Sequence, residues 1–296
     1  MQTRSPVWLD SPALPASLRD LSHPPAGLWC LGDPDTLASR AMVAIVGTRE
    51  ASAYGERTAT RLASACARAG LVVVSGLARG IDAAAHRAAM AAGGRTIAVQ
   101  GPGVDVPYPV AHRSLHRAIQ DQGAVVSEME PGTPAFPGCF PRRNRIIAAL
   151  ARVTVVVEAG FKSGAINTAG QALDLGRTVA AVPGQIDDPR AAGTNVLIRD
   201  GASVITDVED LLMTFGLSTN TGPVEAGPNA ATAADWPDDL RHILGRMGGS
   251  EFSAAQLASR TQMSARQASE SLLRLELAGL VERVGSGYRQ VGGRGA

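Results

Sequence analysis

Short runs rich in valine, isoleucine and alanine recur between residues 43 and 206, and alanine-rich segments of helical pattern separate them. The runs are VAIVG, LVVVSG, TIAVQG, AVVSE, VTVVVEA, TVAAVPG and SVIT. Strands that alternate with helices of about 10–15 residues form βαβ units, which build a parallel sheet. Because several runs are almost continuously apolar, we expect strands that are buried on both faces. The sequence therefore predicts an α/β fold with a doubly wound, mostly parallel sheet.

Changes in composition divide the 296 residues into four segments. Residues 1–40 are interrupted by prolines and are interpreted as an N-terminal strap, and residues 41–216 as the main α/β domain. Residues 217–235 have almost no bulky apolar side chains to offset the entropy of ordering, so they are interpreted as a flexible linker. Residues 236–296 form a second domain. The strap is expected to pack on the main domain through four apolar side chains, Trp8, Leu9, Leu28 and Trp29.

The second domain shows three short helical patterns followed by a hairpin pattern. The helical patterns are DLRHILGRMG, SAAQLASRTQM and SARQASESLLRLELAGL, and the hairpin is VERVGSGYRQV with Gly285–Gly287 at its tip. Ser264 is expected to cap the third helix, because a serine just before a helix accepts a hydrogen bond from a free backbone N–H. Three helices and a two-stranded wing predict a small winged-helix domain that contains a helix-turn-helix.

The overall charge gives no sign of a nucleic-acid partner. The chain has 28 lysines and arginines against 27 aspartates and glutamates, so the formal net charge is +1 and any basic surface must be local. The cysteines Cys30, Cys66 and Cys139 are far apart, which argues against a disulfide framework and against a zinc site. Neither a signal peptide nor a run of about 20 apolar residues that could span a membrane is evident, so we expect a cytoplasmic protein.

Several motifs of enzymes and of cofactor-binding domains are absent from the sequence. The turn after the first run reads GTREASAYGE and not G-x-G-x-x-G, which disfavours NAD and FAD. The chain has no GxxxxGK[ST] sequence, no serine nucleophile elbow and no evident pair of acid and base. We therefore expect no catalytic residues, no cofactor and no metal.

Two glycine-containing turns follow neighbouring strands and suit phosphate groups. Each turn combines backbone N–H groups, the beginning of a helix and an arginine at the carboxyl end of a strand, where open α/β sheets bind ligands. Two such turns predict a ligand with more than one phosphate. The alternative is that each arginine is a surface residue paired with a carboxylate. The residues expected to bind phosphate are Gly47, Thr48, Arg49, Ser75, Gly76 and Arg79.

The helix that follows the second turn holds two titratable residues for which we predict structural roles. Asp82 is expected to cap or orient the first turn of this helix, or to fix Arg79. His86 lies in the apolar segment DAAAHRAAM, so we expect a buried histidine bonded to a backbone carbonyl rather than a catalytic base.

Further cations and aromatic rings follow the later strands. Tyr108 lies in the turn after the third run, the segment FPRRNRII follows the fourth, and a lysine follows the fifth. Aromatic stacking combined with phosphate neutralisation is how proteins hold single strands. The three arginines of this segment, Arg142, Arg143 and Arg145, span one helical turn. One of them is therefore expected to face the sheet and pair with a carboxylate such as Glu128 or Glu158. Phe140 is expected to stack on a base, and the alternative is that it is a core residue at the beginning of the helix. The residues expected to contact nucleic acid here are Phe140, Arg142, Arg143, Asn144, Arg145, Lys162, Ser163 and Gly164.

These ordered motifs resemble the DNA-processing protein A family, also called DprA or Smf. The resemblance covers about residues 27–212 and rests on VAIVGTR with the YG that follows, SGLARGIDAAAH, the YP and SE pairs, FPRRNRII, VVVEA followed by SG, and VPG with GTNVLIRDGA. It implies a Rossmann-like domain that binds single-stranded DNA without much sequence preference, with the phosphate pocket at the two glycine-containing turns and the lysine turn. It also implies protection of incoming DNA and its delivery to the RecA recombinase in natural transformation, without catalysis. The family forms dimers, and the resemblance implies contacts at Asn195, Val196, Leu197 and Ile198.

The chain departs from the family in two places. Many relatives begin with a helical domain that this sequence does not show. The turn that often carries asparagine after Tyr-Pro reads YPVAH, which places Val110 and His112 there. The resemblance implies nothing about binding at those two places.

Two other functions fit parts of the sequence. A nucleotide-binding hydrolase of the nucleoside monophosphate phosphoribohydrolase type could hold one phosphate and a base in the same turns, but VVEAGFKSGAINTAGQ replaces its PGG-x-GT-x-x-E signature. A transcription regulator could place the winged helix on duplex DNA, yet the third helix offers only Arg266, Gln267 and Arg274 as polar readers. The favoured prediction is a protein without enzymatic activity that binds single-stranded DNA.

Overall fold

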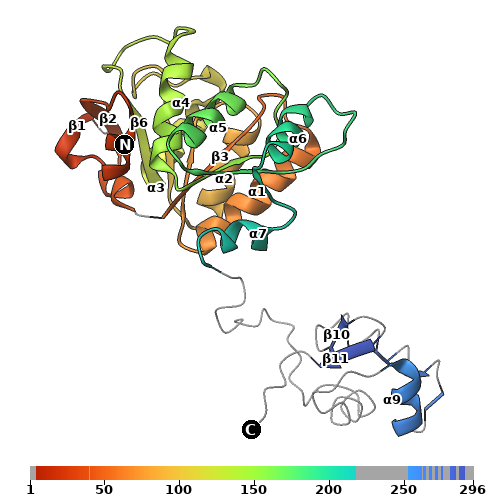
Figure 1. Cartoon of the computed structure of the whole chain (residues 1–296). Helices are drawn as coiled ribbons and strands as arrows, with labels where there is room; N and C mark the ends of the chain where they lie inside the picture. Colours follow the sequence, from red (N-terminus) through yellow and green to blue (C-terminus); the bar gives the residue numbers. More distant parts are fainter. Residues whose placement is uncertain are drawn as a thin grey trace. The chain divides into compact units, whose positions relative to one another are not determined.

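The structure is a computed structural model that describes residues 5–39 and 41–217 and part of the C-terminal region. In that region it describes residues 253–261, 263–264, 267–268, 271–272, 275, 281–284 and 287–290. The chain divides into two compact units, residues 1–222 and 223–296 (Figure 1). Each unit has a hydrophobic core of its own.

Within residues 5–217, nine strands form one sheet in the order β1-β2-β6-β5-β4-β3-β7-β8-β9. Its strands are β1 (Val7–Asp10), β2 (Gly27–Gly32), β3 (Met42–Val46), β4 (Val72–Ser75), β5 (Thr96–Val99), β6 (Gly123–Ser127), β7 (Val153–Val156), β8 (Thr178–Ala181) and β9 (Ser203–Val204). Strands β3 to β9 are parallel, and they correspond to the seven predicted runs. The connection order reverses between β3 and β7, as in doubly wound sheets. The predicted fold class is therefore confirmed.

The expected N-terminal strap contributes two strands to this sheet. β1 pairs with β2, and β2 pairs with β6, both antiparallel, with Trp29 opposite Ser127. Leu28 is fully buried and Leu9 packs on the core, whereas Trp8 is 42% exposed and its ring centroid lies 5.3 Å from that of Trp29. Short 3-10 helices at Ser11–Ala13, Ala16–Asp20 and Pro34–Ala38 occupy the proline-containing stretches. The strap and the main domain thus share one sheet.

Helices cover both faces of the sheet. They are α1 (Ala53–Arg68), α2 (Ile81–Ala91), α3 (Arg113–Gln122), α4 (Cys139–Leu150), α5 (Gly164–Asp174), α6 (Ala192–Arg199) and α7 (Val208–Met213), and a 3-10 turn lies at Val110–His112. Alternate residues of β3 separate the two layers, since Val43 and Ile45 pack with α1 and α2 while Ala44 and Val46 pack with α4 and α5. None of the helices in the described part of the chain is long and apolar enough to cross a membrane.

The described part of the C-terminal unit contains helix α9 (Ala254–Thr261) and the strands β10 (Val281–Val284) and β11 (Gly287–Gln290). The two strands pair antiparallel, as the hairpin pattern predicts. Ser264 Oγ accepts a hydrogen bond from Gln267 N at 3.3 Å and Gln267 Oε1 accepts one from Ser264 N at 3.0 Å, so the predicted cap is confirmed as a capping box. The linker from residue 218 onward, the first helical pattern and the hairpin tip at Gly285 lie outside the described residues.

Candidate nucleic-acid interface

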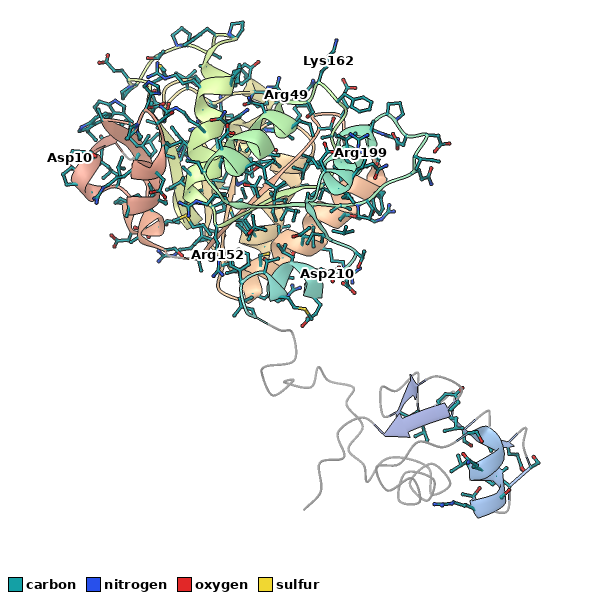
Figure 2. The ribbon with its side chains drawn as sticks, viewed as in Figure 1. Asp10, Arg49, Arg152, Lys162, Arg199 and Asp210 are labelled. Carbon is teal, nitrogen blue, oxygen red and sulfur yellow. The ribbon has the colours of Figure 1, made fainter. Side chains whose placement is uncertain are left out.

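A cavity of about 1000 Å³ opens where the turns after β3, β4 and β7 meet the beginning of α4. The strands β3 and β7 are neighbours at the point where the connection order reverses, which is where α/β sheets gather ligands. We call this space the main cavity. Arg49 and Lys162 lie at the same edge of the domain, and Arg152 and Asp210 lie at the opposite edge (Figure 2). Three separate turns therefore bring their side chains to one site.

Three exposed cations line the main cavity or its rim, namely Arg49, Arg79 and Lys162. Each comes from a different turn, after β3, β4 and β7. Among the residues that the structure describes, no carboxylate forms an ion pair with any of the three. The alternative that Arg49 and Arg79 are surface residues paired with carboxylates is therefore not supported. Their charges stay available for an anionic ligand.

The backbone N–H groups of the two glycine-containing turns are largely used within the protein. Asp82 Oδ2 accepts hydrogen bonds from Gly76 N at 3.1 Å and from Ala78 N at 3.3 Å. Thr48 N donates to the backbone oxygen of Glu158 at 2.6 Å. Burial raises the pKa of the Asp82 carboxyl, an effect that the charge of Arg143 opposes. Asp82 thus holds the glycine-containing turn that precedes α2, which differs from the expected roles of capping the first turn of α2 or fixing Arg79.

Ser75 and Gly76, both expected to bind phosphate, are structural residues. Ser75 is fully buried and its hydroxyl donates to the backbone oxygen of Ile45 at 2.7 Å, which ties β4 to β3. A Cβ added at Gly76 would lie 2.5 Å from the guanidinium nitrogens of Arg143. Glycine is therefore required here by the close approach of the Arg143 side chain, and the expected contact of Ser75 and Gly76 with phosphate stays a prediction.

Arg143 is the arginine of α4 that faces the sheet. Its Nη1 donates to the backbone oxygen of Gly76 at 2.7 Å and also to that of Val99. Burial lowers the pKa of its guanidinium to about 10, and the nearby carboxylate of Asp82 acts in the opposite direction. Asn144 is also buried, and its Nδ2 donates to Gly164 O at 3.2 Å. Both side chains hold the turns together and both also line the main cavity, so the expected contact of these two residues with DNA stays a prediction.

The two remaining arginines of α4 pair with Glu128, one of the two carboxylates proposed from the sequence. Arg145 Nη2 lies 2.5 Å from Glu128 Oε1, and its Nη1 donates to the backbone oxygen of His23 at 2.8 Å. Arg142 Nε lies 3.5 Å from Glu128 Oε2, with its side chain 58% exposed. Arg145 therefore anchors the N-terminal segment to α4, whereas Arg142 keeps an exposed side chain near the site.

Two aromatic rings form one wall of the main cavity. The ring centroids of Tyr108 and Phe140 lie 5.1 Å apart, and the Cζ atom of Arg49 lies 5.4 Å from the centroid of Phe140. Phe140 is half-buried, so it is neither a core residue nor an isolated surface ring. Sequence reasoning missed Phe136, which also lines the cavity and is 44% exposed. Its position four residues before Phe140 in the same segment was an available signal.

The lysine turn begins α5. Ser163 caps this helix, since its Oγ accepts a hydrogen bond from Ala165 N at 3.2 Å. Lys162 and Gly164 are exposed beside it. The serine hydroxyl is engaged by the cap as an acceptor, and its O–H stays free to donate. Of the three residues, Lys162 is the one that supplies charge to the site.

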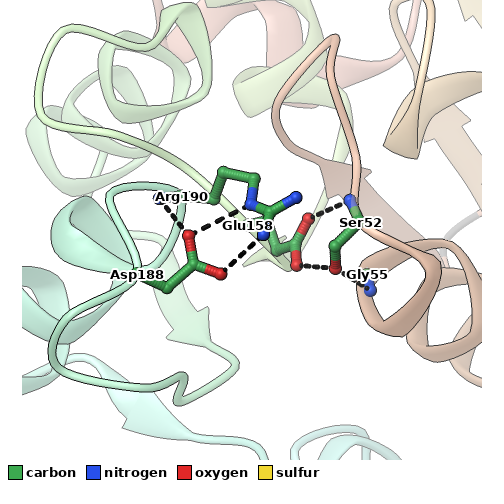
Figure 3. Close-up of polar contacts among 5 residues, drawn as sticks. All are labelled: Ser52, Gly55, Glu158, Asp188 and Arg190. Carbon is green, nitrogen blue, oxygen red and sulfur yellow. Dashed lines mark hydrogen bonds and ion pairs between the residues drawn. The ribbon is translucent and has the colours of Figure 1, made fainter.

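Glu158 does not line the main cavity and belongs to a hydrogen-bond network with Ser52 and Gly55 (Figure 3). Its Oε2 accepts a hydrogen bond from Ser52 N at 2.9 Å and its Oε1 accepts one from Ser52 Oγ, which in turn accepts one from Gly55 N at 3.0 Å. Asp188 and Arg190 form a separate ion pair at 2.9 Å next to it. Glu158 is 5% exposed and thus fixes the beginning of α1 instead of pairing with an arginine of α4.

His86 is buried, as predicted, but its hydrogen bond differs from the expected one. Its Nδ1 lies 2.7 Å from the hydroxyl of Thr96 and not next to a backbone carbonyl. Burial lowers the pKa of its imidazole to about 3, and the charges of Arg143, His112 and Arg87 add to this effect. His86 does not line the main cavity.

The residues implied in dimer contacts form the middle of α6. Asn195, Val196, Leu197 and Ile198 are all half-buried. The amide of Asn195 is engaged within the domain, where it accepts from Gly184 N at 3.2 Å and donates to Gly184 O at 3.1 Å.

In the described part of the chain, no group of three or more His, Cys, Asp or Glu side chains could hold a metal ion.

Comparisons with known proteins agree with this architecture. A family model described as DNA recombination-mediator protein A matches residues 5–216, and a DprA winged helix domain model matches residues 227–287. A putative DNA processing protein DprA from Mycobacterium tuberculosis is 45% identical over 218 residues, which is 73% of this chain and 56% of that protein. Protein Smf from Escherichia coli is 36% identical over 283 residues, with 94% of this chain and 75% of that protein covered. The chain thus spans little more than half the length of the mycobacterial relative.

Two solved structures share the fold. The crystal structure of DNA processing protein A from Streptococcus pneumoniae matches 72% of this chain and 74% of that one, with a TM-score of 0.67 and 38% identity. The Helicobacter pylori protein, reported with its single-stranded DNA binding mode, matches with a TM-score of 0.66 and 30% identity over 72% of this chain and 96% of that one. Together with the match over residues 5–216, these similarities show that the chain belongs to the DNA recombination-mediator protein A family, DprA or Smf, and carries a DprA winged helix domain at its C-terminal end.

Proposed function

We propose that the protein binds single-stranded DNA in the main cavity, without catalysing a reaction. The observation that supports this most directly is the set of three exposed cations, Arg49, Arg79 and Lys162, which meet at one cavity and have no ion-pair partner among the described residues. Cations from three turns suit an extended polyanion better than a single phosphate. The related H. pylori protein is reported with a single-stranded DNA binding mode, which fits this proposal.

The aromatic rings explain why a single strand is the preferred ligand. Tyr108 and Phe140 stand 5.1 Å apart at the cavity wall, with the cations beside them. The face of a base can stack on such rings only when the base is not paired within a duplex. Stacking is tolerant of sequence, because every base has an aromatic face. We therefore infer a preference for single-stranded over duplex DNA with little dependence on overall sequence.

The hydrolase alternative has less support from the geometry. Glu158 is the acidic residue closest in sequence to the lysine turn, yet its carboxylate is bonded to Ser52 and does not line the main cavity. Of the two carboxylates that line the cavity, Asp82 accepts two backbone hydrogen bonds with its Oδ2, and Glu50 lies in the turn after β3, away from the segment that replaces the hydrolase signature. A catalytic acid or base must reach the substrate with a free oxygen or proton. We therefore infer a binding protein.

The partners follow from family membership and are part of the same proposal. We infer that the protein protects incoming single strands and delivers them to the RecA recombinase in the cytoplasm during transformation and recombination. We also infer a homodimer through α6, at Asn195–Ile198. The RecA step is tested by adding the protein to single strands coated with a single-strand-binding protein and measuring RecA ATPase activity. Faster onset is expected, and an unchanged onset would contradict the delivery step.

A competition titration on the full chain tests the central proposal. A labelled single strand is displaced by unlabelled single-stranded DNA, by duplex DNA of the same length and by a nucleoside monophosphate. We expect the single strand to compete best, and the mononucleotide to compete poorly because it reaches only one cation. Equal or tighter binding of the duplex would refute the proposal. Release of free base from the mononucleotide would instead favour the hydrolase.

A further inference from the structure

Gln100 carries a buried side chain whose polar atoms have no partner. The residue follows β5 and is 3% exposed, and neither Oε1 nor Nε2 forms a hydrogen bond with any described residue. Its backbone N–H, in contrast, donates to the backbone oxygen of Val126 at 2.7 Å, as the sheet ladder requires. Buried side-chain amides are nearly always hydrogen-bonded in native proteins, so an exception points to a function at that place.

Gln100 lines a second cavity of about 330 Å³, which we call the Gln100 cavity. Arg49, Arg79, Tyr108 and Phe140 line both this cavity and the main cavity, so the two spaces adjoin. The volume is at the lower end of the range of small-ligand pockets, about 300–1,000 Å³, and is ample for a single nucleobase. A strand whose phosphates lie on the exposed arginines therefore has a base-sized space within reach.

The walls of the Gln100 cavity combine flat aromatic and apolar surfaces with a single available amide. Tyr108 and Phe140 supply ring surface, and Pro102 and Pro109 supply apolar contact. The guanidinium of Arg143 also reaches this cavity, but it already donates to Gly76 O and Val99 O. Gln100 therefore carries an uncommitted donor and an uncommitted acceptor beside this wall, and because both amide atoms are covered in the free protein, they reach the cavity only after a rotation of the Gln100 side chain.

We propose that the Gln100 cavity receives one unstacked nucleobase of the bound strand, with adenine preferred, and that the base edge bonds to the Gln100 carboxamide. This inference rests on the proposed binding of single-stranded DNA. A carboxamide presents a donor and an acceptor side by side, and it pairs with the N6 amino group and N7 of adenine in a bidentate manner. The expected site is thus one position of adenine preference within binding that is otherwise sequence-tolerant.

The test compares two strands of equal length and charge on the full chain. One strand is oligodeoxyadenylate, and in the other every adenine is replaced by purine, which lacks the 6-amino group. We expect the wild-type protein to bind the adenine strand about fivefold more tightly, the ratio that one neutral hydrogen bond supplies. In Gln100→Leu, which keeps a similar shape without the amide, this ratio is expected to fall to about one.

Thermal unfolding separates this role from a structural one. Because the amide forms no hydrogen bond with any described residue, Gln100→Leu is expected to unfold at the same or a higher temperature than the wild type. Gln122→Leu, at an exposed position at the end of α3, is the matched control and is expected to keep the fivefold ratio. Gln100→Met serves as a second variant if the leucine variant does not fold.

The outcomes distinguish this inference from the function on which it rests. If the wild type binds neither strand, the proposed function fails. If it binds both strands equally well, or purine more tightly, single-strand binding stands and the base site is refuted. If Gln100→Leu keeps the wild-type ratio, the preference arises elsewhere and the assignment to Gln100 is wrong.

Discussion

The salt dependence of binding is the most direct consequence of the three exposed cations. We expect Arg49→Ala, Arg79→Ala and Lys162→Ala each to weaken single-strand binding and to reduce its dependence on salt. Each side chain is exposed and has no carboxylate partner among the described residues, so each can neutralise one phosphate in full. The effect should be the same for all sequences, because the phosphate backbone carries no base information.

The size of the effect follows from counterion release. For single strands the slope of log affinity against log salt is about −0.7 per neutralised phosphate. Each substitution should therefore flatten the slope by about 0.7, and the triple variant by about 2.1. Between about 50 and 200 mM salt, one contact accounts for about a 2.6-fold change in affinity and three for about an 18-fold change. These differences are well resolved by fluorescence anisotropy with a labelled oligonucleotide.

Two surface arginines supply the matched control. Arg61 pairs with Asp207 at 2.5 Å and Arg95 pairs with Asp33 at 3.0 Å, and neither lines the main cavity. The double variant Arg61→Ala with Arg95→Ala should leave the slope unchanged. Arg49→Lys keeps the charge but loses the planar group over Phe140, so it should keep the slope and bind less tightly. If the triple variant folds and keeps the wild-type slope, the phosphate site has been misplaced.

Four further predictions concern stability. Gly55→Ala should destabilise the protein by about 1–3 kcal/mol in urea unfolding, because the added Cβ would lie 2.3 Å from the Glu158 carboxylate. Gly170→Ala should instead stabilise the protein by about 0.5–1 kcal/mol, because the added Cβ on α5 meets no other atom within 4 Å. Arg143→Met should destabilise by about 3–5 kcal/mol, since it leaves buried carbonyl acceptors without their donor and removes the positive charge that opposes the cost of burying Asp82, and a loss below about 1 kcal/mol would contradict its structural role. His86 has a folded-state pKa of about 3, below the ordinary value of 6.5. Its contribution is therefore present above pH 6.5 and lost on acidification, with a slope of up to about 1.4 kcal/mol per pH unit that His86→Gln should reduce.

The central sheet is predictable because each buried parallel strand is recorded locally in the chain. Runs such as VVVS and VTVV are apolar on both faces, and the segments between them have the period of a helix. The antiparallel strands β1 and β2 lack this signature, since VWLD and GLWCLG are short and sit among prolines and glycines, and β1 leaves Val7 and Trp8 exposed. β2 enters the sheet by antiparallel pairing with β6, a contact between segments almost 100 residues apart in sequence that no local pattern encodes, and β1 then pairs with β2.

The site is predictable in its location but not in the role of each side chain. That cations follow several strands is visible in the sequence, and topology then brings them to one edge. Which arginine of α4 faces the sheet depends on how the helix is rotated about its axis, and the period alone allows Arg142, Arg143 or Arg145. Similarly, the sequence indicates that the glycine-containing turn after β4 has backbone N–H donors. It does not indicate that Asp82, six residues after Gly76, accepts hydrogen bonds from them. Acceptors of that kind are identified only when the turn is folded.

The positive charges of the exposed Arg49 and the buried Arg143 influence each other in the site. Burial is the largest influence on the pKa of Arg143 and lowers it, Asp82 opposes this, and the charge of Arg49 lowers it further. Arg49 and Arg143 therefore repel each other in the free protein, and the interior hydrogen bonds to Gly76 and Val99 hold Arg143 in place against this repulsion. A phosphate beside Arg49 would relieve the repulsion and so would be bound more tightly than by an isolated arginine. By linkage, a bound strand should stabilise the fold by an amount that grows with its concentration, and Arg49→Ala should reduce that stabilisation while slightly stabilising the free protein.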